Sequence, residues 1–107
     1  MLNLPLPPGS GGAEMRAAYE GRVFPRLRDW QPELILISAG FDAHADDPLA
    51  NLMWTEDDFA WVTRGLCDIA DELCGGRVVS TLEGGYDLPA LATSVAVHVT
   101  ELMERAA

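Results

Sequence analysis

Four side chains that bind metals or move protons follow an aliphatic run in the stretch LILISAGFDAHADDPL, residues 34–49. They are Asp42, His44, Asp46 and Asp47. Carboxylates and imidazoles both bind Zn²⁺, and a catalytic zinc uses three protein ligands and leaves one position for water. In an extended loop Asp42 and His44 face the same side and would supply two ligands. The alternative is that Asp42 and Asp47 accept hydrogen bonds from loop amides while His44 and Asp46 are solvated, because loop aspartates usually bond locally.

A second candidate is the stretch LEGGY, residues 82–86. Gly84 and Gly85 permit backbone conformations closed to other residues, or the close approach of a ligand. The hydroxyl of Tyr86 directly after them could donate a hydrogen bond to a developing oxyanion. The alternative is a strand-to-helix turn with the tyrosine packed over it, and the residue types alone leave both interpretations open.

Three further residues have side chains that could bind metals or react, but their sequence positions favour structural roles. His98 lies between two valines on a predicted helix, so we expect it at a helix interface or on the surface rather than at a metal. Cys67 and Cys74 are seven positions apart on one predicted helix, about 10 Å between Cα atoms. That exceeds the roughly 7 Å limit for a disulfide, so we expect two reduced thiols.

The apolar pattern predicts which elements position the two loops. In chain order these are a helix over 13–30, a strand over 33–38, a helix over 55–74, a strand over 77–82 and a helix over 91–102. We expect a kink or restart near 22–24, since Pro25 removes a backbone hydrogen bond. The aliphatic run at 33–38 is typical of a parallel strand covered on both faces.

Strands that alternate with helices predict an α/β fold with a parallel, helix-flanked sheet. Ligands of open α/β sheets bind at the carboxyl ends of the strands, where the two loops begin. Two strands make only a fragment of such a sheet, so the chain looks incomplete.

Composition narrows the function classes. The 107 residues are enough for one small domain or part of one, and 49% of them are hydrophobic, as in globular proteins. The net charge of −10, with only seven Lys and Arg, argues against direct nucleic-acid binding and suits a cationic substrate. No stretch has the length of a membrane span and no signal-peptide pattern is present, so we expect a cytoplasmic protein without membrane contact.

In this order and spacing, four motifs resemble the C-terminal third of the zinc-dependent histone deacetylase family. They are NLPLPPGSG, PELILISAGFDAHADDPL, MWTEDDFAWVTRGL and VVSTLEGGYDLPALATSVAVHV, and the resemblance covers roughly residues 2–104. The closest likeness is to class II and bacterial members, including acetoin-utilisation and acetylpolyamine amidohydrolase proteins. The resemblance implies that residues 1–107 are the C-terminal segment of a deacetylase domain, part of an arginase-like three-layer α/β/α fold that is incomplete in this chain.

Matched positions inherit expected roles from the family. Asp42 corresponds to a zinc ligand, and Tyr86 to the tyrosine that hydrogen-bonds the substrate carbonyl and the oxyanion. Gly84 and Gly85 resemble glycines that line the substrate channel, and Leu49 matches a position near the channel floor. His44 matches no family ligand, so the resemblance overrules the two-ligand hypothesis.

The family's Asp-x-His motif and its His-His pair lie upstream of the matched region and are absent here. We therefore expect Zn²⁺ in the intact architecture but not on this chain alone. The expected reaction is hydrolysis of an acetylated amine, of the acetyl-lysine or acetylpolyamine type, to acetate and free amine. The expected partners are that substrate, a missing N-terminal portion or partner chain, and further copies of the chain through self-association.

Two alternatives remain open at this point. The chain could be a non-catalytic oligomerisation or binding module derived from the same fold. It could also be a self-contained hydrolase that uses Asp42, His44 and Tyr86 without zinc.

Overall fold

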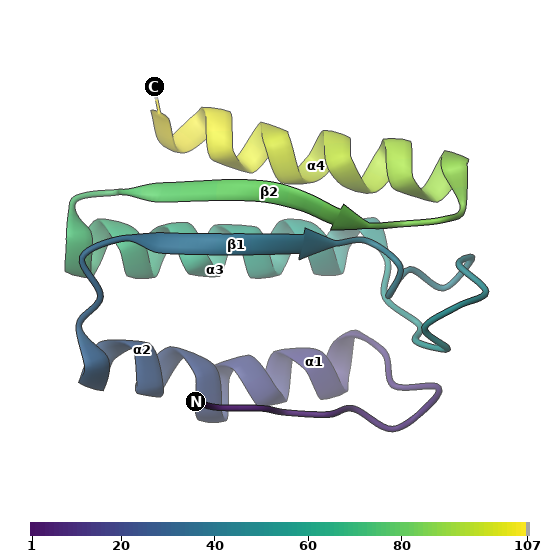
Figure 1. Ribbon diagram of the computed structural model, residues 1–107, viewed down its shortest axis with the longest axis horizontal. Coiled ribbons are helices and arrows are strands. Elements are labelled where there is room, and N and C mark those ends of the chain that lie inside the picture. The colour runs from purple at the N-terminus through teal and green to yellow at the C-terminus, as the bar shows by residue number, and fades with distance from the viewer. Residues whose placement is uncertain (107) are drawn as a thin grey trace.

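The computed structural model describes residues 1–106, and the side chain of the last of these is not considered. Two strands alternate with helices as predicted (Figure 1). The elements are α1 (Gly12–Ala18), η1 (Tyr19–Val23), α2 (Phe24–Trp30), β1 (Ile35–Gly40), α3 (Glu56–Cys74), β2 (Val78–Gly84) and α4 (Leu88–Ala106). None of the described helices combines the length and hydropathy needed to cross a bilayer.

The first helix changes its geometry at the proline. α1 and α2 are joined by η1, a π-helical turn closed by the N–H of Phe24 donating to the carbonyl of Tyr19. Pro25 then occupies the first turn of α2, where its missing N–H costs least. The predicted restart near 22–24 is confirmed, and its form is a widened turn of the kind found as a bulge within helices.

The two strands pair in parallel, with Ile35 opposite Val78 and Ala39 opposite Leu82. Both run two residues further than predicted, to Gly40 and Gly84. The predicted ends followed the aliphatic side chains, whereas strand pairing depends on backbone groups that small residues also provide. The Phe41 N–H still donates to the Gly84 carbonyl at 2.8 Å, so the strands remain side by side where the loops begin.

Local signals set the bounds of α3 as predicted. The Thr55 N–H donates to the Asp58 carboxylate at 2.9 Å, which satisfies one of the free donors at the helix start. Gly75 ends the helix with φ 64°, a left-handed conformation that favours glycine. Cys67 and Cys74 on this helix are buried free thiols, which confirms the expected reduced pair.

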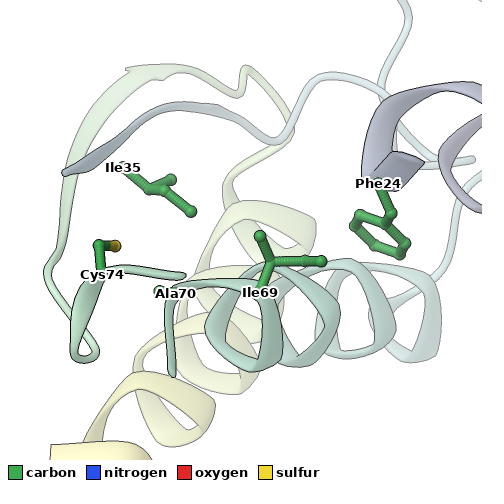
Figure 2. Close-up of a cluster of buried hydrophobic side chains, with 5 residues drawn as sticks. All are labelled: Phe24, Ile35, Ile69, Ala70 and Cys74. Atoms are coloured by element: carbon green, nitrogen blue, oxygen red, sulfur yellow. The ribbon is translucent and has the colours of Figure 1, made fainter. Parts of the chain in front are cut away.

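The helices cover one face of the two-stranded sheet. The consecutive elements α1, η1 and α2 form one rod of helix, called the α1–α2 rod below. Figure 1 shows α3 behind the strands, with α4 on one side of α3 and the α1–α2 rod on the other. Figure 2 shows the core between them, where side chains from α2, β1 and α3 meet: Phe24, Ile35, Ile69, Ala70 and Cys74.

The opposite face of the sheet is open. Leu36 of β1 and Val79 of β2 point to this face and are 71% and 53% exposed. A strand covered on both faces was predicted, and in this chain only one face is covered, because the second helical layer of a three-layer fold is not among the described residues. The fold is therefore part of an α/β architecture, as expected.

Candidate functional site

The loops that follow β1 and β2 lie at the same end of the molecule (Figure 1). Asp42 comes two residues after β1 and Tyr86 two residues after β2. A Cβ atom placed on Gly84 would lie 3.2 Å from the Tyr86 hydroxyl oxygen and 3.6 Å from Asp42 Oδ1. The phenol and the carboxylate thus converge over Gly84, as the parallel strand order predicts.

The two glycines make this convergence possible in different ways. Gly84 leaves the space between the phenol and the carboxylate open, because any side chain there would crowd both. Gly85 has φ 144°, a conformation that side-chain-bearing residues rarely adopt. A Cβ on Gly85 would also lie 2.7 Å from Leu91 Cδ1 and 3.3 Å from Phe41 Cβ, so a larger residue would displace these neighbours as well as strain the backbone.

The Asp42 carboxylate is half-buried and available. Among residues 1–106 it accepts no hydrogen bond and forms no ion pair. The interpretation of Asp42 as an acceptor for loop amides is therefore wrong. An oxygen donor held at a strand end without a protein partner has the properties of a ligand for a metal ion.

Asp47 has the opposite character. Its side chain is buried, and it accepts N–H hydrogen bonds from Leu49 at 3.0 Å, Tyr86 at 2.7 Å and Asp87 at 3.1 Å. Burial alone raises the pKa of the Asp47 carboxyl, but these three donors outweigh it and hold the pKa below its usual range. The prediction that Asp47 accepts bonds from loop amides is confirmed, and two of the amides belong to the Tyr86 loop.

His44 is buried and fully engaged. Its Nε2 lies 2.6 Å from Glu56 Oε1, and its Nδ1 accepts the Asp46 N–H at 3.1 Å. The proton is therefore assigned to Nε2, and neither nitrogen is available to a metal or a substrate. Both sequence interpretations of His44, as a ligand and as a solvated residue, are wrong, and the engaged ring argues against a zinc-free hydrolase of Asp42, His44 and Tyr86.

Glu56 is the residue of this end of the molecule that the sequence did not reveal. It joins His44 to Thr93, whose hydroxyl donates to Glu56 Oε2 at 3.0 Å, so it connects the first loop, α3 and α4. The His44 hydrogen bond is the main reason that the pKa of the Glu56 carboxyl lies below its usual value. A glutamate in the first turn of a helix is ordinary, and no sequence signal marked this one.

His98 is a buried interface residue, as expected. Its Nδ1 lies 2.8 Å from the hydroxyl of Thr63 on α3, and its Nε2 lies 2.8 Å from the hydroxyl of Ser80 on β2. Its ring also packs edge-on against Phe41 at the root of the first loop. Burial lowers the pKa of His98, which favours the neutral ring.

Three large side chains in or next to the two loops are exposed. Leu49 of the first loop, Tyr86 of the second and Leu88 at the start of α4 are 64%, 57% and 73% exposed. Within the described residues, no group of three or more His, Cys, Asp or Glu side chains could hold a metal ion. Within these residues Asp42 could supply one oxygen ligand to a zinc ion, fewer than the three protein ligands that a catalytic zinc takes.

Comparisons with known proteins agree with this geometry. Residues 1–102 match the family model described as the histone deacetylase domain. The chain is 50% identical over 95 residues to "Histone deacetylase 10, chloroplastic" of Oryza sativa subsp. japonica, covering 89% of this chain and 21% of that protein. It is 40% identical over 95 residues to "Polyamine deacetylase HDAC10" of Homo sapiens, covering 89% of this chain and 14% of that protein.

A solved structure shows the same fold. The histone deacetylase Clr3 superposes with a TM-score of 0.87 at 30% identity, over 96% of this chain and 17% of that chain. The chain belongs to the histone deacetylase domain family. It spans about a fifth of the length of its plant relatives.

Proposed function

We propose that this chain supplies the C-terminal part of a zinc-dependent deacetylase site, which hydrolyses an acetylated amine to acetate and a free amine. The convergence of Asp42 and Tyr86 over Gly84 carries the proposal, because it joins an unpartnered carboxylate with a hydroxyl donor. Membership of the histone deacetylase domain family supports the reaction class.

In the proposed site Asp42 serves as one zinc ligand. A bound zinc would polarise the amide carbonyl and activate a water molecule for attack. Tyr86 would donate its hydroxyl hydrogen to the carbonyl oxygen as negative charge develops there. Gly84 and Gly85 would line the channel for the acetylated chain, and Leu49 would contribute apolar surface near its floor.

The remaining ligands would come from an N-terminal portion of the domain or from a partner chain. Two features support such a partner: the open face of the sheet, and an apolar cavity of about 760 Å³ beside the N-terminal segment. The cavity is lined by Leu2, Leu4 and Leu6 together with residues of the α1–α2 rod. Without that partner we expect the chain to be inactive and to self-associate through its open face.

The proposed substrate is an acetylated cationic amine, either acetyl-lysine or an acetylpolyamine. The net charge of −10 supports a cationic substrate, and the names of the rice and human relatives support the two amine types. We propose a cytoplasmic location, to be checked by cell fractionation because the rice relative is described as chloroplastic.

Metal content and turnover test the proposal together. The purified chain, dialysed after exposure to zinc, should retain no zinc and hydrolyse no fluorogenic acetyl-lysine or acetylpolyamine substrate. Addition of the segment that carries the missing ligands should produce about one bound zinc per site and turnover. Stoichiometric zinc on the chain alone would contradict the shared site, and a zinc-loaded assembly inactive on both substrates would contradict the reaction.

Tyr86→Phe tests the hydroxyl itself. In the active assembly it should lower kcat by roughly 10²–10³-fold, as loss of one oxyanion donor does. Thr100→Val is the control, because it also removes one hydroxyl group, and the exposed Thr100 hydroxyl donates to the Ala96 carbonyl of the same helix, outside the two loops. Equal activity of the two variants would remove the proposed role of Tyr86.

A further inference from the structure

We infer that Asp47 is a positioning residue, which fixes the Tyr86 hydroxyl relative to Asp42 by fastening the Tyr86 loop to the Asp42 loop. Its consequence for catalysis rests on the proposed function, whereas the fastening itself does not. The inference begins from the placement of Asp47, a buried carboxylate five residues after Asp42 whose main partners lie 39 and 40 positions further along the chain.

Both oxygens of Asp47 are used. Oδ1 accepts the Leu49 N–H within its own loop, while Oδ2 accepts the consecutive N–H groups of Tyr86 and Asp87. The Asp47 N–H donates to the His44 carbonyl at 3.0 Å, and the buried His44 ring is held in turn by Glu56. The carboxylate therefore connects a braced loop to the backbone of the next loop.

Tyr86 needs this external support. The residue is 57% exposed, and its hydroxyl has no hydrogen-bond partner among residues 1–106. The two residues before it are glycines, which restrict the backbone least. Asp47 therefore supplies what the loop lacks, since a fixed backbone at residue 86 limits where the phenol can reach.

A carboxylate suits this position better than an amide. Two N–H donors share one oxygen, and hydrogen bonds to an ionised acceptor are shorter and stronger than neutral ones. Asn would keep a single carbonyl oxygen and would turn its own N–H group toward the donors or toward Leu49. Asp47→Asn is therefore the sharpest test, because it preserves size while removing the negative charge and one of the two acceptor oxygens.

The matched control is Asp46→Asn, the same chemical change at the preceding residue, whose side chain is 74% exposed. In this chain, amide hydrogen exchange followed by NMR should be about tenfold or more faster at Tyr86 and Asp87 in Asp47→Asn than in Asp46→Asn, as expected when a charge-assisted hydrogen bond is lost. Amides in the middle of α3 should exchange alike in both variants. Unchanged exchange at Tyr86 and Asp87 would overturn the inference.

A second measurement needs no variant. In the unaltered chain, NMR couplings transmitted through hydrogen bonds should join the amide nitrogens of Tyr86 and Asp87 to the Asp47 carboxyl carbon. If Asp47→Asn fails to fold, these couplings decide the question, and their absence under native conditions overturns it.

Kinetics in the active assembly then test the consequence. Asp47→Asn should lower kcat at least tenfold with little change in KM, and should have little further effect in a Tyr86→Phe background, because both changes remove one function. An equal loss in both backgrounds would overturn the positioning role. If Asp47→Asn speeds exchange at Tyr86 but the unaltered assembly deacetylates no substrate, the result would support the fastening of the two loops and reject the proposed function.

Discussion

The two loops of the site are built in different ways. The loop after β1 has its own bracing, because His44 bonds to Glu56 of α3. In addition, the Ala45 N–H donates to the Trp54 carbonyl, and the Trp54 N–H donates to the Ala43 carbonyl. The loop after β2 consists of Gly85, Tyr86 and Asp87, and Asp47 of the first loop holds its turn through the Tyr86 and Asp87 N–H groups. The difference teaches that Asp42 depends on local structure, whereas Tyr86 depends on the Gly85 conformation and on the neighbouring loop.

One of the two largest stability effects should come from the second loop through Gly85→Ala. The new side chain would occupy a strained backbone region at φ 144° and collide with Leu91, so we expect a loss of about 1–3 kcal/mol in the free energy of unfolding. Chemical denaturation followed by circular dichroism measures the change.

Gly21→Ala is the control for Gly85→Ala. Gly21 is helical and a Cβ there would meet nothing within 4 Å, so alanine should be neutral or stabilise the chain by about 0.5–1 kcal/mol. Similar stability of both alanine variants would mean that the second loop tolerates a wider range of conformations than its structure indicates.

The first loop should be sensitive to His44→Gln. Glutamine cannot place a donor on Glu56 and an acceptor on the Asp46 N–H with the geometry of the ring, so we expect a loss of about 1–3 kcal/mol from buried groups left unpaired. The neighbouring exposed change Asp46→Asn should stay within about 0.5 kcal/mol. Equal unfolding free energies for the two variants would show that the first loop is not braced through His44.

Lowering the pH should reduce the free energy of unfolding in two stages. Burial lowers the pKa of His98, so the unfolded chain binds this proton more readily, and stability falls as the pH drops below the ordinary histidine value of about 6.5. Bonding to His44 lowers the pKa of Glu56, whose contribution is present above the ordinary carboxyl value of about 4.3 and is lost as the pH falls through the folded value.

Unfolding curves at pH 7, 6 and 5 for the unaltered chain and for His98→Asn measure the contribution of His98 separately from that of Glu56. The difference in the free energy of unfolding between the two chains should shrink toward pH 5, because asparagine carries no titrating group. A difference that is constant with pH would mean that His98 titrates equally in the folded and unfolded chains.

The element order, the reduced cysteines and the meeting of the two loops followed from the sequence, because periodicity and parallel strand order fix them. The ends of the strands did not follow from the sequence. Backbone pairing extends β1 through Ala39 to Gly40, and it extends β2 through Glu83 to Gly84. The burial of His44 was also missed. Its partner Glu56 lies on another element, and only the folded chain brings an ordinary first-turn glutamate beneath a loop histidine.

The smallest stability effect should be that of Asp42→Asn, at the centre of the site. Its carboxylate has no partner in the described chain, so the free energy of unfolding should change by less than about 0.5 kcal/mol, while zinc retention and turnover of the active assembly should be lost. Denaturation of the isolated chain and metal analysis of the assembly measure the two effects separately. A large loss of stability would make Asp42 a structural residue of the first loop, and unchanged stability with zinc retained would move the metal to other ligands. The proposed role of Asp42 requires both results together: Asp42→Asn leaves the free energy of unfolding unchanged, and the assembly that contains it fails to retain zinc. The first loop would then hold the Asp42 carboxylate in place without depending on it for stability.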